Sequence, residues 1–158
     1  MTGSHMKKNN CVLEYSWDND YFKKSFFDRI NQEIILAEVI NKPVEVSLSL
    51  VDDATIRQYN AQFRNKDTAT DVLAFAEKDK EVSWPDEKEK NYLGEILISV
   101  DTAKKQAKEH KHSLSDEVAW LYIHGFLHLL GYDHEISKKE AQRMGEKTQE
   151  IFLNIKEK

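Results

Sequence analysis

The sequence predicts an α+β fold: a single domain with about four strands in one mixed sheet and helices packed against it. Strict alternation of apolar and polar residues over 44–50 is typical of a half-buried strand. Apolar residues at steps of three and four between 20 and 40 are typical of an amphipathic helix. Segments of these two kinds follow one another along all 158 residues without an internal repeat or a low-complexity linker, so one hydrophobic core is expected.

The N-terminal half is predicted to alternate strands and helices. Residues 11–17 form the first strand because their Val, Leu and Tyr side chains favour extended structure. The helix over 20–40 follows, and the half-buried strand comes next. Asp52 and Asp53 can then cap a helix that runs through Phe63.

Two further strands are predicted in the second half, over 71–76 and 94–100, where short apolar runs occur. Residues 77–92 lie between them and are rich in Lys, Glu and Asp, which predicts a loop or a hairpin excursion. Three helices complete the chain and are expected over 101–112, 115–130 with Ser115 as its N-cap, and 137–155.

Composition limits the classes of protein that fit. Charged residues make up 32% of the chain and the net charge is −5, which argues against nonspecific coating of nucleic acid. No stretch approaches the roughly 18 apolar residues of a membrane span. No secretory signal opens the chain, and Cys11 is its single cysteine, so we expect a cytoplasmic protein without a disulfide or membrane contact. Residues 1–6 have the form of an expression-vector remnant, which leaves 7–158 as one domain.

The strongest chemical signal is a run of three histidines, His124, His128 and His134, with the spacing H-x-x-x-H-x-x-G-x-x-H. The first two are four residues apart, so on a helix they project from one face and can bind a single cation. Gly131 can end that helix in the left-handed conformation and turn the chain back toward the metal. Three protein ligands leave a tetrahedral zinc ion one open position, which is typical of a catalytic ion.

The residue after the first histidine separates this pattern from the zinc proteases. Those enzymes carry a glutamate there as the general base for the metal-bound water, whereas this chain has Gly125. The spacing of a protease is therefore present without its base, which disfavours a peptidase. The remaining histidines do not share the pattern: His5 belongs to the vector remnant, and His110 and His112 lie in a charged stretch that predicts a solvated face.

Three blocks of the sequence, taken in order, resemble the YbeY family of bacterial ribosomal RNA maturation factors. Residues 60–75 are similar to the family segment that contains an arginine and a T-D-V-L-S-F strand, and residues 93–99 are similar to its G-D-I strand. Residues 124–134 match H-G-x-L-H-L-x-G-Y-D-H at every fixed position. The resemblance extends over residues 44–134.

Four positions depart from the family pattern: Ala69 and Ala76 replace prolines, Ala74 replaces a serine and Glu95 replaces an aspartate. None of the four is a predicted metal ligand. We therefore expect the activity to be retained, with differences in the detailed shape of the groove.

The resemblance implies a single-strand-specific, metal-dependent endoribonuclease of ribosomal RNA processing and ribosome quality control, with one zinc ion per chain. It also implies the small ribosomal subunit and a ribosome-associated GTPase as partners. Arg64 matches the family's functional arginine, and a guanidinium suits the charge that develops on a phosphate. Asp133 is the second catalytic candidate, either orienting a histidine or accepting a proton, although an aspartate in a turn also commonly makes only local hydrogen bonds.

Two alternative functions stay open at this point. One is a ribosome-assembly factor that binds RNA and protein while its zinc ion serves shape alone. The other is a metal-dependent peptidase or amidase, which the histidine spacing supports and Gly125 opposes. The sequence also leaves open whether the nucleophile is water or the 2′-hydroxyl of the RNA.

Overall fold

The computed structural model describes residues 11–16, 22–79, 91–133 and 137–157. Within these ranges four strands form one sheet in the spatial order β1-β2-β4-β3. Their bounds are Cys11–Ser16 (β1), Val44–Val51 (β2), Val72–Ala76 (β3) and Tyr92–Ser99 (β4). β1 and β4 both run parallel to β2, whereas β3 pairs with β4 in antiparallel fashion. The predicted α+β fold with a mixed four-stranded sheet is confirmed.

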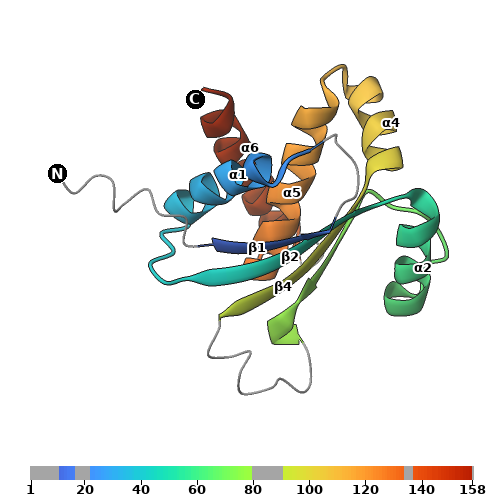
Figure 1. Cartoon of the computed structure of the whole chain (residues 1–158), viewed down its shortest axis with the longest axis horizontal. Helices are drawn as coiled ribbons and strands as arrows, with labels where there is room; N and C mark the ends of the chain where they lie inside the picture. The colour runs from blue at the N-terminus through green and yellow to red at the C-terminus, as the bar shows by residue number, and fades with distance from the viewer. Residues whose placement is uncertain (1–10, 17–21, 80–90, 134–136, 158) are drawn as a thin grey trace.

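Helices cover both faces of this sheet (Figure 1). α1, α5 and α6 lie on one face, and α2 lies on the other beside β4, while α4 links the end of β4 to α5. A short 3₁₀ turn, η2 (Glu77–Asp79), follows β3. The helix bounds are Lys24–Ala37 (α1), Asp53–Arg64 (α2), Val100–His110 (α4), Leu114–Leu130 (α5) and Lys138–Lys156 (α6).

The alternating side chains of β4 divide the interior into a large and a small core. Ile96 and Ile98 are fully buried in the large core between the sheet and the helices α1, α5 and α6. Leu97 points the other way and packs with Ile56 of α2 and Leu73 of β3. This period-two arrangement follows from strand geometry, and it places α5 on the sheet directly beneath β3 and β4.

The prediction that Ser115 is the N-cap of α5 is wrong. Ser113 is the N-cap: its backbone is extended, and its side-chain oxygen accepts a hydrogen bond from the Asp116 backbone N–H at 3.0 Å. The predicted strand over 94–100 also differs slightly, since β4 begins at Tyr92 and Val100 already belongs to α4. Ser99 ends the strand because its hydroxyl caps the Thr102 N–H at 3.2 Å.

Some predictions fall on residues outside the described ranges. These are the vector remnant over 1–6, the central part of the charged loop over 80–90, and His134. In the described part of the chain no helix has the length and apolar character that crossing a bilayer requires.

Candidate active-site cleft

α5 presents His124 and His128 on one face, as the four-residue spacing predicts. Their ring centroids are 5.2 Å apart and the ring planes are inclined at 79°. Both side chains are half-buried, in a helix whose other residues between Leu121 and Leu129 are buried. The two imidazoles therefore reach the surface of the molecule at one place, where they can share a cation.

Gly131 ends α5 in the left-handed conformation that the motif predicts. Its φ is 113°, its N–H donates to the His128 carbonyl oxygen at 3.0 Å, and the Tyr132 N–H donates to the Leu127 carbonyl at 3.1 Å. This backbone conformation favours glycine, because other L-residues rarely adopt it. His134 lies beyond the described residues, so its role as third ligand stays a prediction.

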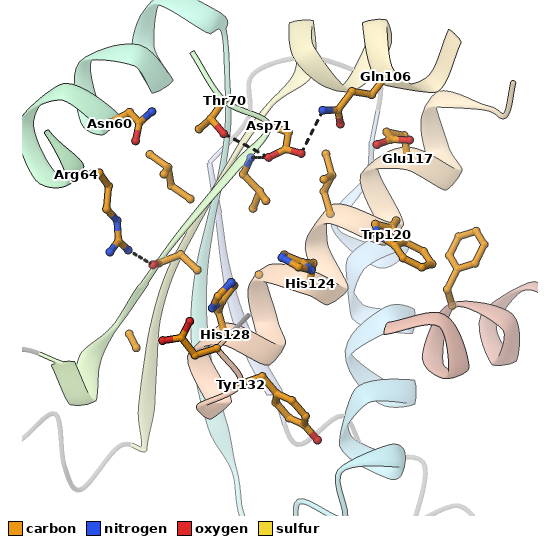
Figure 2. Close-up of a pocket in the computed structure, with 18 of the residues that line it drawn as sticks. Asn60, Arg64, Thr70, Asp71, Gln106, Glu117, Trp120, His124, His128 and Tyr132 are labelled. Carbon is orange, nitrogen blue, oxygen red and sulfur yellow. Dashed lines mark hydrogen bonds between the residues drawn. The ribbon is translucent and has the colours of Figure 1, made fainter. Parts of the chain in front are cut away.

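His124 and His128 open onto a cleft of about 1110 Å³ between α5, β3 and the C-terminal end of α2. Arg64 and Asp133 line the same cleft, and Figure 2 shows Arg64 on the wall opposite the two histidines. The fold thus brings together four of the five predicted site residues. Charges of both signs lie along the cleft: the cations are Arg64, Lys66 and Lys78, and the carboxylates are Asp71, Glu117 and Asp133.

Two contacts with β3 hold the Arg64 side chain. Its Nη2 donates to the Ala74 carbonyl oxygen at 2.7 Å, and its Cζ lies 5.0 Å from the centre of the Phe75 ring. Asn65 next to it is in the left-handed conformation and ends α2, so Arg64 occupies the last turn of its helix. These contacts hold the guanidinium at the rim of the cleft, where it would otherwise move freely in solvent.

Asp71 connects β3 with α4 at one end of the cleft. Its carboxylate accepts hydrogen bonds from the Val72 N–H at 2.7 Å and from Gln106 Nε2 of α4 at 3.2 Å. Thr70 Oγ1 lies 3.5 Å from the same carboxylate. These bonds begin β3 and fix its distance from α4, which sets the width of this part of the cleft.

Gly125 lies where α5 packs closely on the sheet. A β-carbon there would lie 3.0 Å from Ile96 Cγ2 and 3.3 Å from Val72 Cγ2, closer than ordinary contacts. The helix therefore lies near enough to β3 and β4 that the position suits glycine. A glutamate, which the zinc proteases keep at this point of the motif, would need both neighbours to move.

Tyr132 anchors the segment that follows α5. Its hydroxyl donates to Glu38 Oε1 of α1 at 2.9 Å, and Arg143 Cζ of α6 lies 4.4 Å from the centre of its ring. Burial raises the pKa of the Tyr132 hydroxyl, and so do its hydrogen bond to Glu38 and the negative charge of that carboxylate. The phenol stays a hydrogen-bond donor at neutral pH and fixes the chain just before Asp133.

His110 and His112 are partly open to solvent, as predicted, but they also make contacts that the charged stretch did not indicate. Both imidazoles contact the carboxylate of Glu117, which is only 3% exposed, and all three residues line the cleft. Their ligand atoms all lie within 4.8 Å of one another. The His-x-His spacing carried a signal, but the turn that brings both rings to Glu117 is not visible in the sequence.

Comparison with known proteins decides the family. A statistical model of the family described as endoribonuclease YbeY matches residues 13–156. The chain belongs to the YbeY endoribonuclease family. The endoribonuclease YbeY of Moorella thermoacetica is 46% identical over 132 residues, which cover 82% of this chain and 83% of that protein. The one from Desulforamulus reducens is 40% identical over 147 residues, covering 93% and 94%.

A solved structure agrees with the YbeY assignment. The solution structure of a Thermotoga maritima protein superposes with a TM-score of 0.61 at 26% identity, covering 91% of this chain and 89% of that chain. Endoribonucleases cleave internal phosphodiester bonds of RNA, so membership of the YbeY family makes RNA the substrate class.

Proposed function

We propose that the chain is a zinc-dependent endoribonuclease that cleaves single-stranded RNA during ribosomal RNA maturation. The observation that carries the proposal is the cleft, where a half-buried histidine pair faces a guanidinium across a space open to solvent. His124, His128 and His134 hold the ion. Imidazoles are ligands that zinc accepts readily, and three of them leave one coordination position open.

The residues of the cleft divide the chemical work. Bound zinc supplies a Lewis acid for phosphate oxygens and an acidified water. Arg64 binds the nonbridging oxygens of the same phosphate, because a guanidinium can donate two parallel hydrogen bonds to it. Asp133 stands close in sequence to the third histidine and orients it or accepts the proton of the nucleophile.

An exposed aromatic pair beside Arg64 supports the preference for single strands. Phe63 is 55% exposed and stacks on Tyr59 with ring centroids 6.0 Å apart and planes inclined at 24°. Its ring also lies 5.5 Å from that of Phe75, under the guanidinium. An unpaired base can stack on such a surface, whereas a base inside a duplex is already stacked on its neighbours.

The alternatives are less well supported. A peptidase would need the glutamate for which position 125 has little room. A purely structural zinc ion would not require a cleft lined by Arg64. The small ribosomal subunit and a ribosome-associated GTPase in the cytoplasm are the partners that we propose from the family resemblance.

Cleavage of a short single-stranded RNA by the protein and by its His124→Ala and His128→Ala variants tests the function. We expect the variants to fold, as judged by circular dichroism, and to lose cleavage together with the metal. Full cleavage by a metal-free variant would contradict the proposal. A 2′,3′-cyclic phosphate on the product would identify the 2′-hydroxyl as nucleophile, and a 5′-phosphate would identify water.

A further inference from the structure

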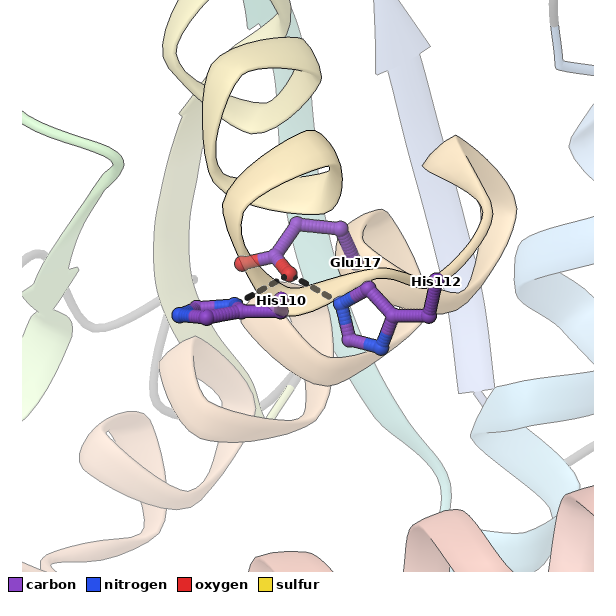
Figure 3. Close-up of side chains that lie close together, drawn as sticks. All are labelled: His110, His112 and Glu117. Carbon is purple, nitrogen blue, oxygen red and sulfur yellow. Dashed lines mark hydrogen bonds and ion pairs between the residues drawn. The ribbon is translucent and has the colours of Figure 1, made fainter.

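A second set of metal-binding side chains lies in the same cleft. His110 is the last residue of α4, His112 lies in the link to α5, and Glu117 is in the first turn of α5. His110 Nδ1 is 3.1 Å from Glu117 Oε1, and His112 Nε2 is 2.5 Å from the same oxygen. Figure 3 shows the two rings approaching that oxygen from either side.

The backbone fixes this convergence. Lys111 adopts the left-handed conformation with φ 58°, and the His112 N–H donates to the Ala107 carbonyl at 3.0 Å, so the chain reverses between the two histidines. Ser113 then caps α5 and accepts the Glu117 N–H on its carbonyl oxygen at 3.1 Å. The three side chains are therefore held together by two helix ends.

Burial makes the Glu117 carboxylate depend on a partner of positive charge or on hydrogen-bond donors. Glu117 is 3% exposed, whereas the His112 and His110 side chains are 30% and 58% exposed. A buried carboxylate needs positive charge or hydrogen-bond donors to offset its desolvation. Both ion pairs that Glu117 makes within the described ranges are with histidine side chains rather than with a lysine or arginine.

We propose that His110, His112 and Glu117 bind a divalent transition-metal ion, separate from the ion of His124 and His128. Two imidazoles and one carboxylate are a donor set that Zn²⁺ and Co²⁺ accept, with bonds of about 2.0–2.2 Å. Ligand atoms around such an ion are about 3.3 Å apart, so His112 Nε2 has to withdraw slightly from Glu117. Each neutral imidazole moves its proton to its other ring nitrogen, and the ion takes the place between the three side chains.

The position of this site suggests what the ion does. Glu117 precedes His124 by seven residues on α5, which is about 10 Å along the helix axis. That is too far for two ions to act on one phosphate, because paired ions are about 4 Å apart in two-metal sites. The second ion would instead hold another phosphate of the same RNA strand. This role rests on the proposed function, whereas the binding of the ion is independent of it.

Metal titration of the apoprotein with Co²⁺ and Zn²⁺ tests the site without RNA. The His124→Ala/His128→Ala double variant should still bind one ion per chain, with the visible absorption of a Co²⁺ complex. Adding His112→Ala or His110→Asn should weaken that binding at least tenfold, and adding Glu117→Gln should do the same. The matched control is Glu109→Gln on the exposed neighbour of His110, which should leave binding unchanged.

Two results would overturn the site: the double variant binds no Co²⁺, or His110→Asn and His112→Ala leave its affinity unaltered. His110 is largely exposed, so its replacement keeps the test valid even if Glu117→Gln fails to fold. On RNA, Glu117→Gln should raise KM about tenfold with little change in kcat. An unchanged KM would overturn the RNA contact alone, and a wild-type protein that binds the second ion but cuts no RNA would overturn the proposed function alone.

Discussion

Arg64 makes two contacts that a lysine cannot reproduce together: a hydrogen bond to the Ala74 carbonyl and stacking over Phe75. If the guanidinium also binds the reacting phosphate, Arg64→Lys should lower kcat/KM on single-stranded RNA about 100-fold, and Arg64→Glu should lower it further. Metal content should not change. Arg57→Lys is the matched control, since Arg57 lies on the same helix but pairs with Asp67. Wild-type rates in Arg64→Glu would remove Arg64 from the mechanism.

Phe63 gives a second test at the level of a single side chain. Phe63→Leu keeps an apolar residue but removes the stacking surface, and we expect KM for single-stranded RNA to rise about tenfold, since one stacked base is worth about 1–3 kcal/mol. Phe63→Trp should restore the wild-type KM. Leu153→Ala, on an exposed apolar residue of α6, serves as control. Equal KM values for the Leu and Trp variants would argue against base stacking.

The sequence could predict individual site residues only where a regular element places them. His124 and His128 share a face because a helix has a fixed period, so their proximity followed from spacing alone. The contacts of His110 and His112 with Glu117 depend on a non-glycine residue, Lys111, in the left-handed conformation. No local sequence rule marks such a residue in advance, which is why this cluster was missed.

At the scale of elements, two glycines in helices should respond to substitution in opposite ways. Gly125→Ala should destabilise the protein by about 1–3 kcal/mol, because the new methyl group would press on Ile96 and Val72. A β-carbon added at Gly145 of α6 would meet no atom of another described element within 4 Å, so Gly145→Ala should stabilise the protein by about 0.5–1 kcal/mol. Urea unfolding of both variants measures the difference. Equal stabilities would mean that α5 can move away from the sheet at little cost.

Element types were predictable from periodicity, whereas their ends were decided by single hydrogen bonds. The alternation of β2 survives intact in its burial pattern, from Val44 to Val51. The start of α5 is set by Ser113, which has the extended backbone of an N-cap and lies three residues after the last residue of α4. The order of the strands in the sheet cannot be predicted from local sequence patterns either. β4 lies between β2 and β3 because of contacts between residues that are distant in the sequence.

At the scale of the whole molecule, metal binding should contribute to stability. An ion that binds the folded chain at about 100 times its dissociation constant adds about 2.7 kcal/mol to the free energy of unfolding. Chelation should therefore lower Tm by several degrees in calorimetry. A variant without His124, His128 and Glu117 should show no such shift, and an unchanged Tm on chelation of the wild-type protein would contradict metal binding.

Cys11 reports on opening of the sheet. Burial raises the pKa of its thiol to about 12, with a further contribution from the charges of Asp28 and Glu45. The native thiol should therefore resist thiol reagents at pH 8 and react once urea unfolds the chain. Because the folded pKa exceeds the unfolded one of 9.0, this thiol should also make the free energy of unfolding fall as pH rises from 9 toward 12. Rapid labelling in native buffer would show that β1 opens locally.

The antiparallel pairing of β3 has one more consequence. β3 is the last strand of the described sheet. Just before it, the Asp71 carbonyl accepts a hydrogen bond from the Ser99 N–H, so it points inward toward β4. Inward and outward backbone groups alternate along an antiparallel pair, so the carbonyl of Ala74, three residues later, points outward from the edge of the sheet. Unpaired rims of this kind invite another chain to add a strand and start aggregation. The Arg64 guanidinium donates a hydrogen bond to that carbonyl, which is then not open to another strand. Replacing Arg64 should therefore favour association of β3 with another chain, whether or not the guanidinium also takes part in RNA cleavage.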